Sequence, residues 1–66
     1  METKNVLYTL RTKKGLSQDE LAEKIFVTRQ AVSRWENGET RPGVETLKLL
    51  SNFFNVSINT LLGSPR

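Results

Sequence analysis

Polar side chains suited to hydrogen bonding are gathered between residues 29 and 37. The set is Arg29, Gln30, Ser33, Arg34 and Asn37. On a helix, at about 100° per residue, all five fall within an arc of roughly 140° that contains no acidic residue. An ordinary solvated helix face favours Glu and Lys instead. Arg bonds guanine through paired N–H groups and Gln bonds adenine in a similar way, so the arc is suited to base edges in a DNA major groove. The predicted base-reading residues are Arg29, Gln30, Ser33 and Arg34.

The opposite side of the same segment is apolar. Ala31, Val32 and Trp35 fall between roughly 200° and 300° on the same helical projection, so this side is suited to packing. Thr28 is placed to cap the helix at its start. We therefore expect a helix from Arg29 to Asn37 that packs on a scaffold with one side and leaves the other free.

Helical spacing of apolar residues continues along the rest of the chain, and no stretch shows the alternation typical of strands. The sequence therefore predicts an all-α fold. The expected elements are helices from Lys4 to Lys14, Gln18 to Ile25, Arg29 to Asn37 and Val44 to Phe54, and a last short turn from Ser57 to Leu62. The expected inward-facing residues of the first, second and fourth helices are Val6, Leu7, Leu10, Leu21, Ala22, Ile25, Val44, Leu47, Leu50 and Phe54.

Local signals mark the ends of these helices. Ser17 and Glu20 have the S-x-x-E spacing of a capping box before the second helix. Gly15 and Gly38 suit the left-handed conformation that ends the first and third helices, and Asn55 suits the exit from the fourth. Two short helices separated by a tight break are therefore expected between residues 17 and 38.

Length and composition limit what the chain does. Its 66 residues make a single domain, 1–66, of which about 4–62 is expected to fold, with 63–66 as a tail. Ten Lys and Arg against seven Asp and Glu give a charge of +3 and a pI near 9.7, which suits a polyanion. The short apolar stretches and the N-terminal sequence predict no membrane span and no signal peptide, hence a cytoplasmic protein.

The residue types argue against an enzyme. The sequence has no Cys and no His, so a thiolate metal site and an imidazole base are missing, and we expect no metal, cofactor or small-molecule site. Asp19, Glu20 and Glu23 make an acidic helix surface, which we interpret as favourable charge in the first turn rather than as catalytic carboxylates.

Several short motifs occur together between about Val6 and Leu62. They are LSQ at Leu16 to Gln18, ELA at Glu20 to Ala22, SRWENG at Ser33 to Gly38, RP at Arg41 and Pro42, and a closing LL. In this combination the chain resembles the helix-turn-helix domain of the Xre and lambdoid Cro/C1 repressor family. The resemblance implies a five-helix lambda-repressor-like DNA-binding domain. It also implies a transcription regulator, in first place a repressor, that binds a pseudo-palindromic operator through its third helix.

The resemblance also assigns roles to residues outside the reading face. It implies a structural ion pair between Arg11 and Glu36, and phosphate contacts from residues around the second helix and the loop after the third. A helix N-terminus favours a phosphate independently, through its free N–H groups. The predicted phosphate-binding residues are Ser17, Gln18, Thr28, Asn37, Thr40 and Arg41.

One residue departs from the family pattern. Phe26 stands before the turn between the two motif helices, where many members have Gly or Asn. A left-handed Phe26 is strained by roughly 1 kcal/mol or more. Either its ring packs well enough to offset this strain, or the turn is rearranged.

Pairing of two copies is expected because one motif helix reads only about four or five base pairs, whereas dimers read two half-sites roughly 34 to 36 Å apart. The candidate contacts of a homodimer are Phe53, Phe54, Val56 and Ile58. The same side chains also suit the core, and only Phe53 falls clearly off the inward stripe. A rival function is a protein-interaction module that docks an antagonist or toxin. Loss of the basic reading face would favour this rival, and the sequence retains that face.

Overall fold

The computed structural model describes residues 3–62, which form five helices and no strand. The helices are α1 (Thr3–Lys13), α2 (Gln18–Lys24), α3 (Arg29–Asn37), α4 (Val44–Phe54) and α5 (Ile58–Leu61). The all-α prediction is confirmed, and α3 and α4 have the expected bounds. Helix α1 lies one residue earlier than expected at both ends, and α2 ends one residue sooner. The predicted tail, 63–66, lies outside the described residues.

Side-chain caps begin three of the helices. The Ser17 hydroxyl accepts a hydrogen bond from the Glu20 amide at 3.1 Å, and the Glu20 carboxylate accepts one from the Ser17 amide at 2.8 Å. This is the predicted capping box. Thr28 caps α3 through the Ala31 amide at 3.1 Å, and Ser57 caps α5 in the same way. Local sequence therefore determines where α2, α3 and α5 start.

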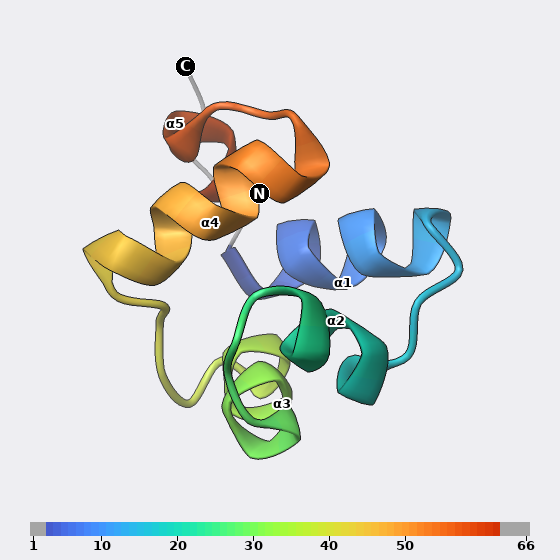
Figure 1. The fold of residues 1–66 in the computed structure, drawn as a ribbon. Helices are drawn as coiled ribbons and strands as arrows, with labels where there is room; N and C mark the ends of the chain where they lie inside the picture. Colours follow the sequence, from blue (N-terminus) through green and yellow to red (C-terminus); the bar gives the residue numbers. More distant parts are fainter. Residues whose placement is uncertain (1–2, 63–66) are drawn as a thin grey trace.

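The helices are arranged around one core, with α3 at the edge of the molecule (Figure 1). Helix α3 packs against α1 and α2, while α5 packs against α4 and α1. The buried apolar residues are Val6, Leu7, Leu21, Ala22, Ile25, Val32, Trp35, Leu47, Leu50, Phe54 and Leu61. Leu10 is partly buried against this core. The scaffold thus holds one side of α3 and leaves its other side at the surface.

The expectation that Val44 faces the core is wrong, because 67% of this residue is exposed. The reason is helical geometry. At about 100° per residue, Val44 lies roughly 90° from the centre of the stripe formed by Leu47, Leu50 and Phe54. As the first residue of α4 it also lies at the end of the helix, where fewer neighbours cover it.

Four helices end in the same backbone motif. A left-handed residue follows each of α1 to α4, and the next amide donates to a carbonyl five residues earlier, as in the Schellman motif. The left-handed residues are Gly15, Phe26, Gly38 and Asn55. The two glycines and Asn55 have their expected conformations.

Phe26 has φ of 62°, and 83% of the residue is exposed. The expectation that packing of the Phe26 ring offsets the strain is therefore wrong. The turn is not rearranged to avoid the left-handed conformation either. The backbone compensates instead: the Val27 amide donates to the Ala22 carbonyl at 2.9 Å, and the Val27 side chain packs against the core. The left-handed conformation of Phe26 is thus held by the hydrogen bond and the core contact of the residue that follows it.

Candidate nucleic-acid interface

The inner side of α3 is anchored in the core. Val32 is fully buried and Trp35 is 6% exposed. Glu36 follows them on the same helix, and its carboxylate also points inward, with a side chain 6% exposed. A carboxylate in such a position needs a cationic partner, because burial of an unpaired charge costs several kcal/mol.

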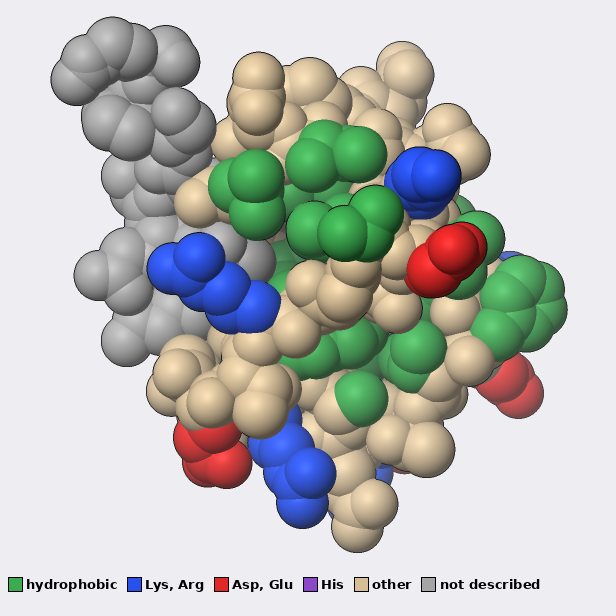
Figure 2. Space-filling model, turned by 90° about the vertical axis from the view of Figure 1, so that its left-hand side faces the viewer, with side chains coloured by type: hydrophobic (Ala, Val, Ile, Leu, Met, Phe, Trp, Pro, Cys, Tyr) green, Lys and Arg blue, Asp and Glu red, His purple; other side chains and the backbone are tan. Residues whose placement is uncertain are grey.

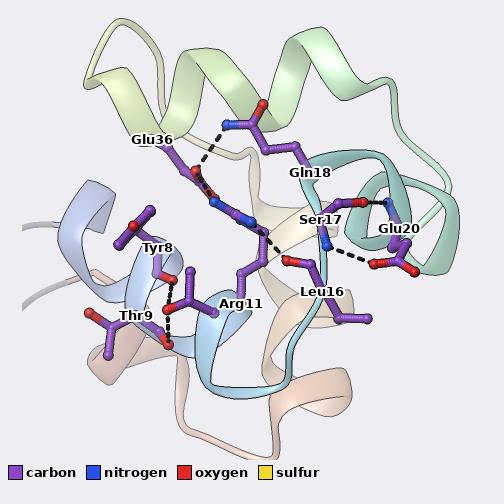
Figure 3. A network of polar contacts seen from close by, with 9 residues as sticks. Tyr8, Thr9, Arg11, Leu16, Ser17, Gln18, Glu20 and Glu36 are labelled. Carbon is purple, nitrogen blue, oxygen red and sulfur yellow. Dashed lines mark hydrogen bonds and ion pairs between the residues drawn. The ribbon is translucent and has the colours of Figure 1, made fainter.

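Arg11 of α1 is that partner (Figure 3). Its Nε lies 2.6 Å from Glu36 Oε2, and its Nη2 donates to Glu36 Oε1 at 2.9 Å. Nη1 donates to the Leu16 carbonyl at 2.8 Å. The hydrogen bond to Glu36 raises the pKa of the Arg11 guanidinium, against the smaller opposing effect of burial. The resemblance implied the ion pair between Arg11 and Glu36. In the structure Arg11 links α1 both to α3 and to the loop that precedes α2.

Gln18 of α2 is the third member of this network. Its Nε2 donates to Glu36 Oε1 at 3.0 Å, so the carboxylate is bonded from both preceding helices (Figure 3). Sequence reasoning assigned Gln18 to phosphate and missed this bond, because 18 positions separate the two residues. The bond leaves one N–H and the carbonyl oxygen of the amide for other partners.

The outer side of α3 carries the predicted base-reading set. Arg29, Gln30, Arg34 and Asn37 are exposed, whereas Ser33 is half-buried. No acidic side chain of α3 joins them, because Glu36 is bonded inside. The structure therefore gathers four hydrogen-bonding side chains on one free helix face, with Ser33 beside them.

Apart from Asn37, which lies on this face, the predicted phosphate-binding residues come before and after α3 in the sequence. Ser17, Thr28, Thr40 and Arg41 are exposed, and Gln18 is half-buried. The Ser17 and Thr28 hydroxyls accept the amides that they cap. Since a hydroxyl also has one O–H to donate, capping leaves these groups able to bond a phosphate oxygen.

Asp19 is a residue near the reading face whose contact was not predicted. Its Oδ1 lies 3.4 Å from Nε of Arg29, across the gap between α2 and α3. Its position in the first turn of α2 fitted a role at the helix dipole, and no local pattern indicated a partner ten positions away. Only the packing of α2 against α3 reveals this ion pair.

The predicted dimer contacts are less exposed than other apolar side chains on or beside α4 and α5. Phe54 is buried in the core, while Phe53, Val56 and Ile58 are partly buried and packed against it. Phe54 is thus corrected from candidate contact to core residue, because it continues the stripe of Leu47 and Leu50. The exposed apolar residues in this region are Val44 and Leu49 on α4 and Leu62 directly after α5. In Figure 2 apolar side chains gather on the face that includes the start of α4, with charged side chains around them.

Other kinds of site find little support in the part of the chain that is described. Among residues 3–62, no cluster of three or more Asp or Glu side chains is placed to bind a metal ion. None of the helices in this range has the length and apolar character needed to span a membrane.

Helix α3 packs by its buried side against α1 and α2 and follows the capped helix α2 after a tight turn, which is the arrangement of a helix-turn-helix motif. The sequence matches the Helix-turn-helix family over residues 7–61. It is 48% identical over 62 residues to the HTH-type transcriptional activator BcrR of Enterococcus faecalis. It is 42% identical over 53 residues to the HTH-type transcriptional regulator ImmR of Bacillus subtilis.

The alignments with BcrR and ImmR cover 94% and 80% of this chain, but only 30% and 42% of the relatives. The chain thus spans less than half the length of these relatives. A transcriptional regulator from Listeria innocua has a similar structure, with a TM-score of 0.90 and 31% identity over 98% of this chain and 61% of that one. The P22 c2 repressor in complex with a synthetic operator has a TM-score of 0.89 and 31% identity, over 94% of both chains. The chain belongs to the Xre/Cro/C1-type helix-turn-helix family of transcription regulators, which is not a family of enzymes.

Proposed function

We propose that this domain binds a specific operator by inserting α3 into the major groove. The observation that carries the proposal is the free face of α3, which combines two Arg with Gln and Asn. The acidic residue of α3, Glu36, is bonded to Arg11 on the buried side and does not lie on this face. In this proposal Arg29, Gln30, Ser33 and Arg34 contact base edges. Ser17, Gln18, Thr28, Asn37, Thr40 and Arg41 contact phosphates and set the register of the helix.

Two copies bind together in this proposal, each on one half of a pseudo-palindromic site. The P22 c2 repressor, a structural neighbour, is described in complex with an operator. Val44 and Leu49 on α4 and Leu62 after α5 are exposed apolar residues that could contribute to the pairing. The partner is double-stranded DNA of a bacterial or phage genome, which places the activity in the cytoplasm.

Repression is the regulatory output that we propose, because a domain bound across a promoter excludes polymerase without any further contact. P22 c2 is named a repressor, whereas BcrR is named an activator. A reporter with the selected operator across its promoter tests the sign: transcription should fall when the protein is expressed. A rise would assign activation instead.

Selection of tight binders from random duplex DNA at about 150 mM salt tests operator binding. We expect an inverted repeat with half-sites about one helical turn apart. The variant Arg29→Ala, Arg34→Ala should lose this enrichment. The variant Lys14→Ala, Lys24→Ala is the matched control, because it removes two positive charges outside the reading face. It should select the same sequence with lower affinity.

Two results would contradict the proposal. Equal enrichment by the arginine double variant and the wild type would remove α3 from base reading. No enrichment by the wild-type domain would favour the protein-interaction module instead.

A further inference from the structure

The ion pair between Asp19 and Arg29 joins α2 to the first residue of α3. Both partners are largely exposed, with side chains 75% and 56% accessible. An exposed pair of this kind contributes little to folding, because water and salt screen it. Its position matters more, because Arg29 is one of the residues proposed to read bases.

The atoms in contact leave the useful end of Arg29 free. In this ion pair Nε of Arg29 lies 3.4 Å from Oδ1 of Asp19. The guanidinium is planar and rigid, and Nη1 and Nη2 at its far end carry four further N–H groups. Guanine offers O6 and N7 side by side in the major groove and accepts two such donors at once. The attraction of a carboxylate beside Nε therefore favours one orientation of the group, while the donors at its far end can still reach the base.

Asp19 is itself held in place by its neighbours. Ser17 and Glu20 fix the first turn of α2 through the capping box. Gln18 bonds Glu36 in the last turn of α3 (Figure 3). The N-terminus of α2 thus contacts α3 at two points. Gln18 bonds Glu36 near the end of α3, and Asp19 pairs with Arg29 at its start. The carboxylate is presented to Arg29 from a part of the backbone that is fixed relative to the reading helix.

We propose that Asp19 is a positioning residue that orients Arg29 toward one guanine of each half-site. This inference rests on the proposed function. An oriented Arg loses less conformational freedom when it binds its base, and ordering one flexible side chain changes affinity by about two- to tenfold. The negative charge of Asp19 also repels nearby phosphates, which weakens binding to all DNA alike. Asp19 thereby increases sequence preference at the expense of overall affinity.

The test compares Asp19→Asn with Glu23→Gln in the full chain. Both variants remove one negative charge from an exposed position on α2, but among the described residues only Asp19 of the two forms an ion pair with a residue of the reading face. The base pair that Arg29 reads is first located as the position where Arg29→Ala loses preference. Fluorescence anisotropy then gives the dissociation constant of each variant for the operator and for operators altered at each position. Thermal melts verify that the variants are folded.

Both variants should bind random DNA more tightly than the wild type. Asp19→Asn alone should lose preference at the Arg29 position, by about two- to tenfold, and keep it elsewhere. Adding Asp19→Asn to Arg29→Ala should cause no further loss at that position. Equal preference in Asp19→Asn and Glu23→Gln would overturn this inference and leave the proposed function intact. Unchanged preference in Arg29→Ala would instead overturn base reading by Arg29 itself, and the role of Asp19 with it.

Discussion

The two sides of α3 differ in what surrounds them. On the inner side, Trp35 packs in the core and Glu36 is bonded by side chains from α1 and α2. On the outer side, Gln30 and Arg34 are exposed to solvent. The same nine-residue helix therefore carries structural contacts on one side and candidate reading contacts on the other. Variants of the inner side should change stability, and variants of the outer side should change DNA preference.

The largest effect is expected for Trp35→Ala. Removal of this buried indole leaves a cavity among the core residues and should cost about 3 to 5 kcal/mol of unfolding free energy. In a domain of this size that loss is comparable with the whole stability, so the domain should be largely unfolded. Circular dichroism during heating measures the effect. Gln30→Ala on the outer side is the control and should melt within a few degrees of the wild type. A normal melt for Trp35→Ala would contradict the assignment of the inner side.

A somewhat smaller loss is expected for Arg11→Met. This change leaves the Glu36 carboxylate buried without its cation, at a cost of about 3 kcal/mol. The double variant Arg11→Met, Glu36→Leu removes both charges and should recover much of the loss, because an apolar pair replaces an ion pair at little cost. Urea unfolding of the single and double variants gives both values. If the double variant is no more stable than Arg11→Met, the cost does not arise from the unpaired carboxylate.

On the outer side, Gln30→Ala should relax preference at one base pair by about 1 to 3 kcal/mol and leave binding to random DNA nearly unchanged. Titrations against the operator and its single-position variants measure this change. An equal loss on operator and random DNA would show that Gln30 reads no base.

Arg41→Ala should act differently from Gln30→Ala, because Arg41 is proposed to contact phosphate. It should weaken binding to all DNA similarly and reduce the salt slope of the binding constant by about one unit. Titration at several salt concentrations gives the slope. A loss of preference confined to one base pair would place Arg41 among the base readers instead.

The parts of the fold that local chemistry determines were predictable from the sequence. Ser17 with Glu20, and Thr28, have the residue types of helix caps, and each cap forms the expected bond. The bounds of α3 and α4 followed from the periodicity between such signals. Gly15 and Gly38 were likewise recognisable as left-handed helix ends.

The contacts that depend on how helices cross were not predictable in the same way. The bonds of Gln18 to Glu36 and of Asp19 to Arg29 require the relative placement of α2 and α3, which no local pattern encodes. The exposure of Val44 depends on where the core ends along α4. The candidate site was therefore predicted as a set of residues, and the resemblance added the Arg11–Glu36 ion pair. The two contacts that join α2 to α3 emerged only from the three-dimensional packing.

The smallest effect separates strain from packing in the turn before α3. Phe26→Gly should stabilise the domain because glycine adopts positive φ without the clash of a Cβ atom. Glycine also makes the unfolded chain more flexible, which opposes folding, so the expected net gain is about 0.5 to 1 kcal/mol. Phe26→Ala is the matched control: it removes the same exposed ring but keeps the left-handed Cβ. It should therefore lie within about 0.5 kcal/mol of the wild type. Thermal or urea unfolding of the three proteins measures the difference between Gly and Ala, which isolates the backbone strain.

Equal stability of the two variants would mean that Phe26 stores no strain that glycine relieves. A large loss in both would show that the exposed ring contributes to folding. Neither variant should alter operator preference, because Phe26 lies outside the face of α3 that is proposed to read bases.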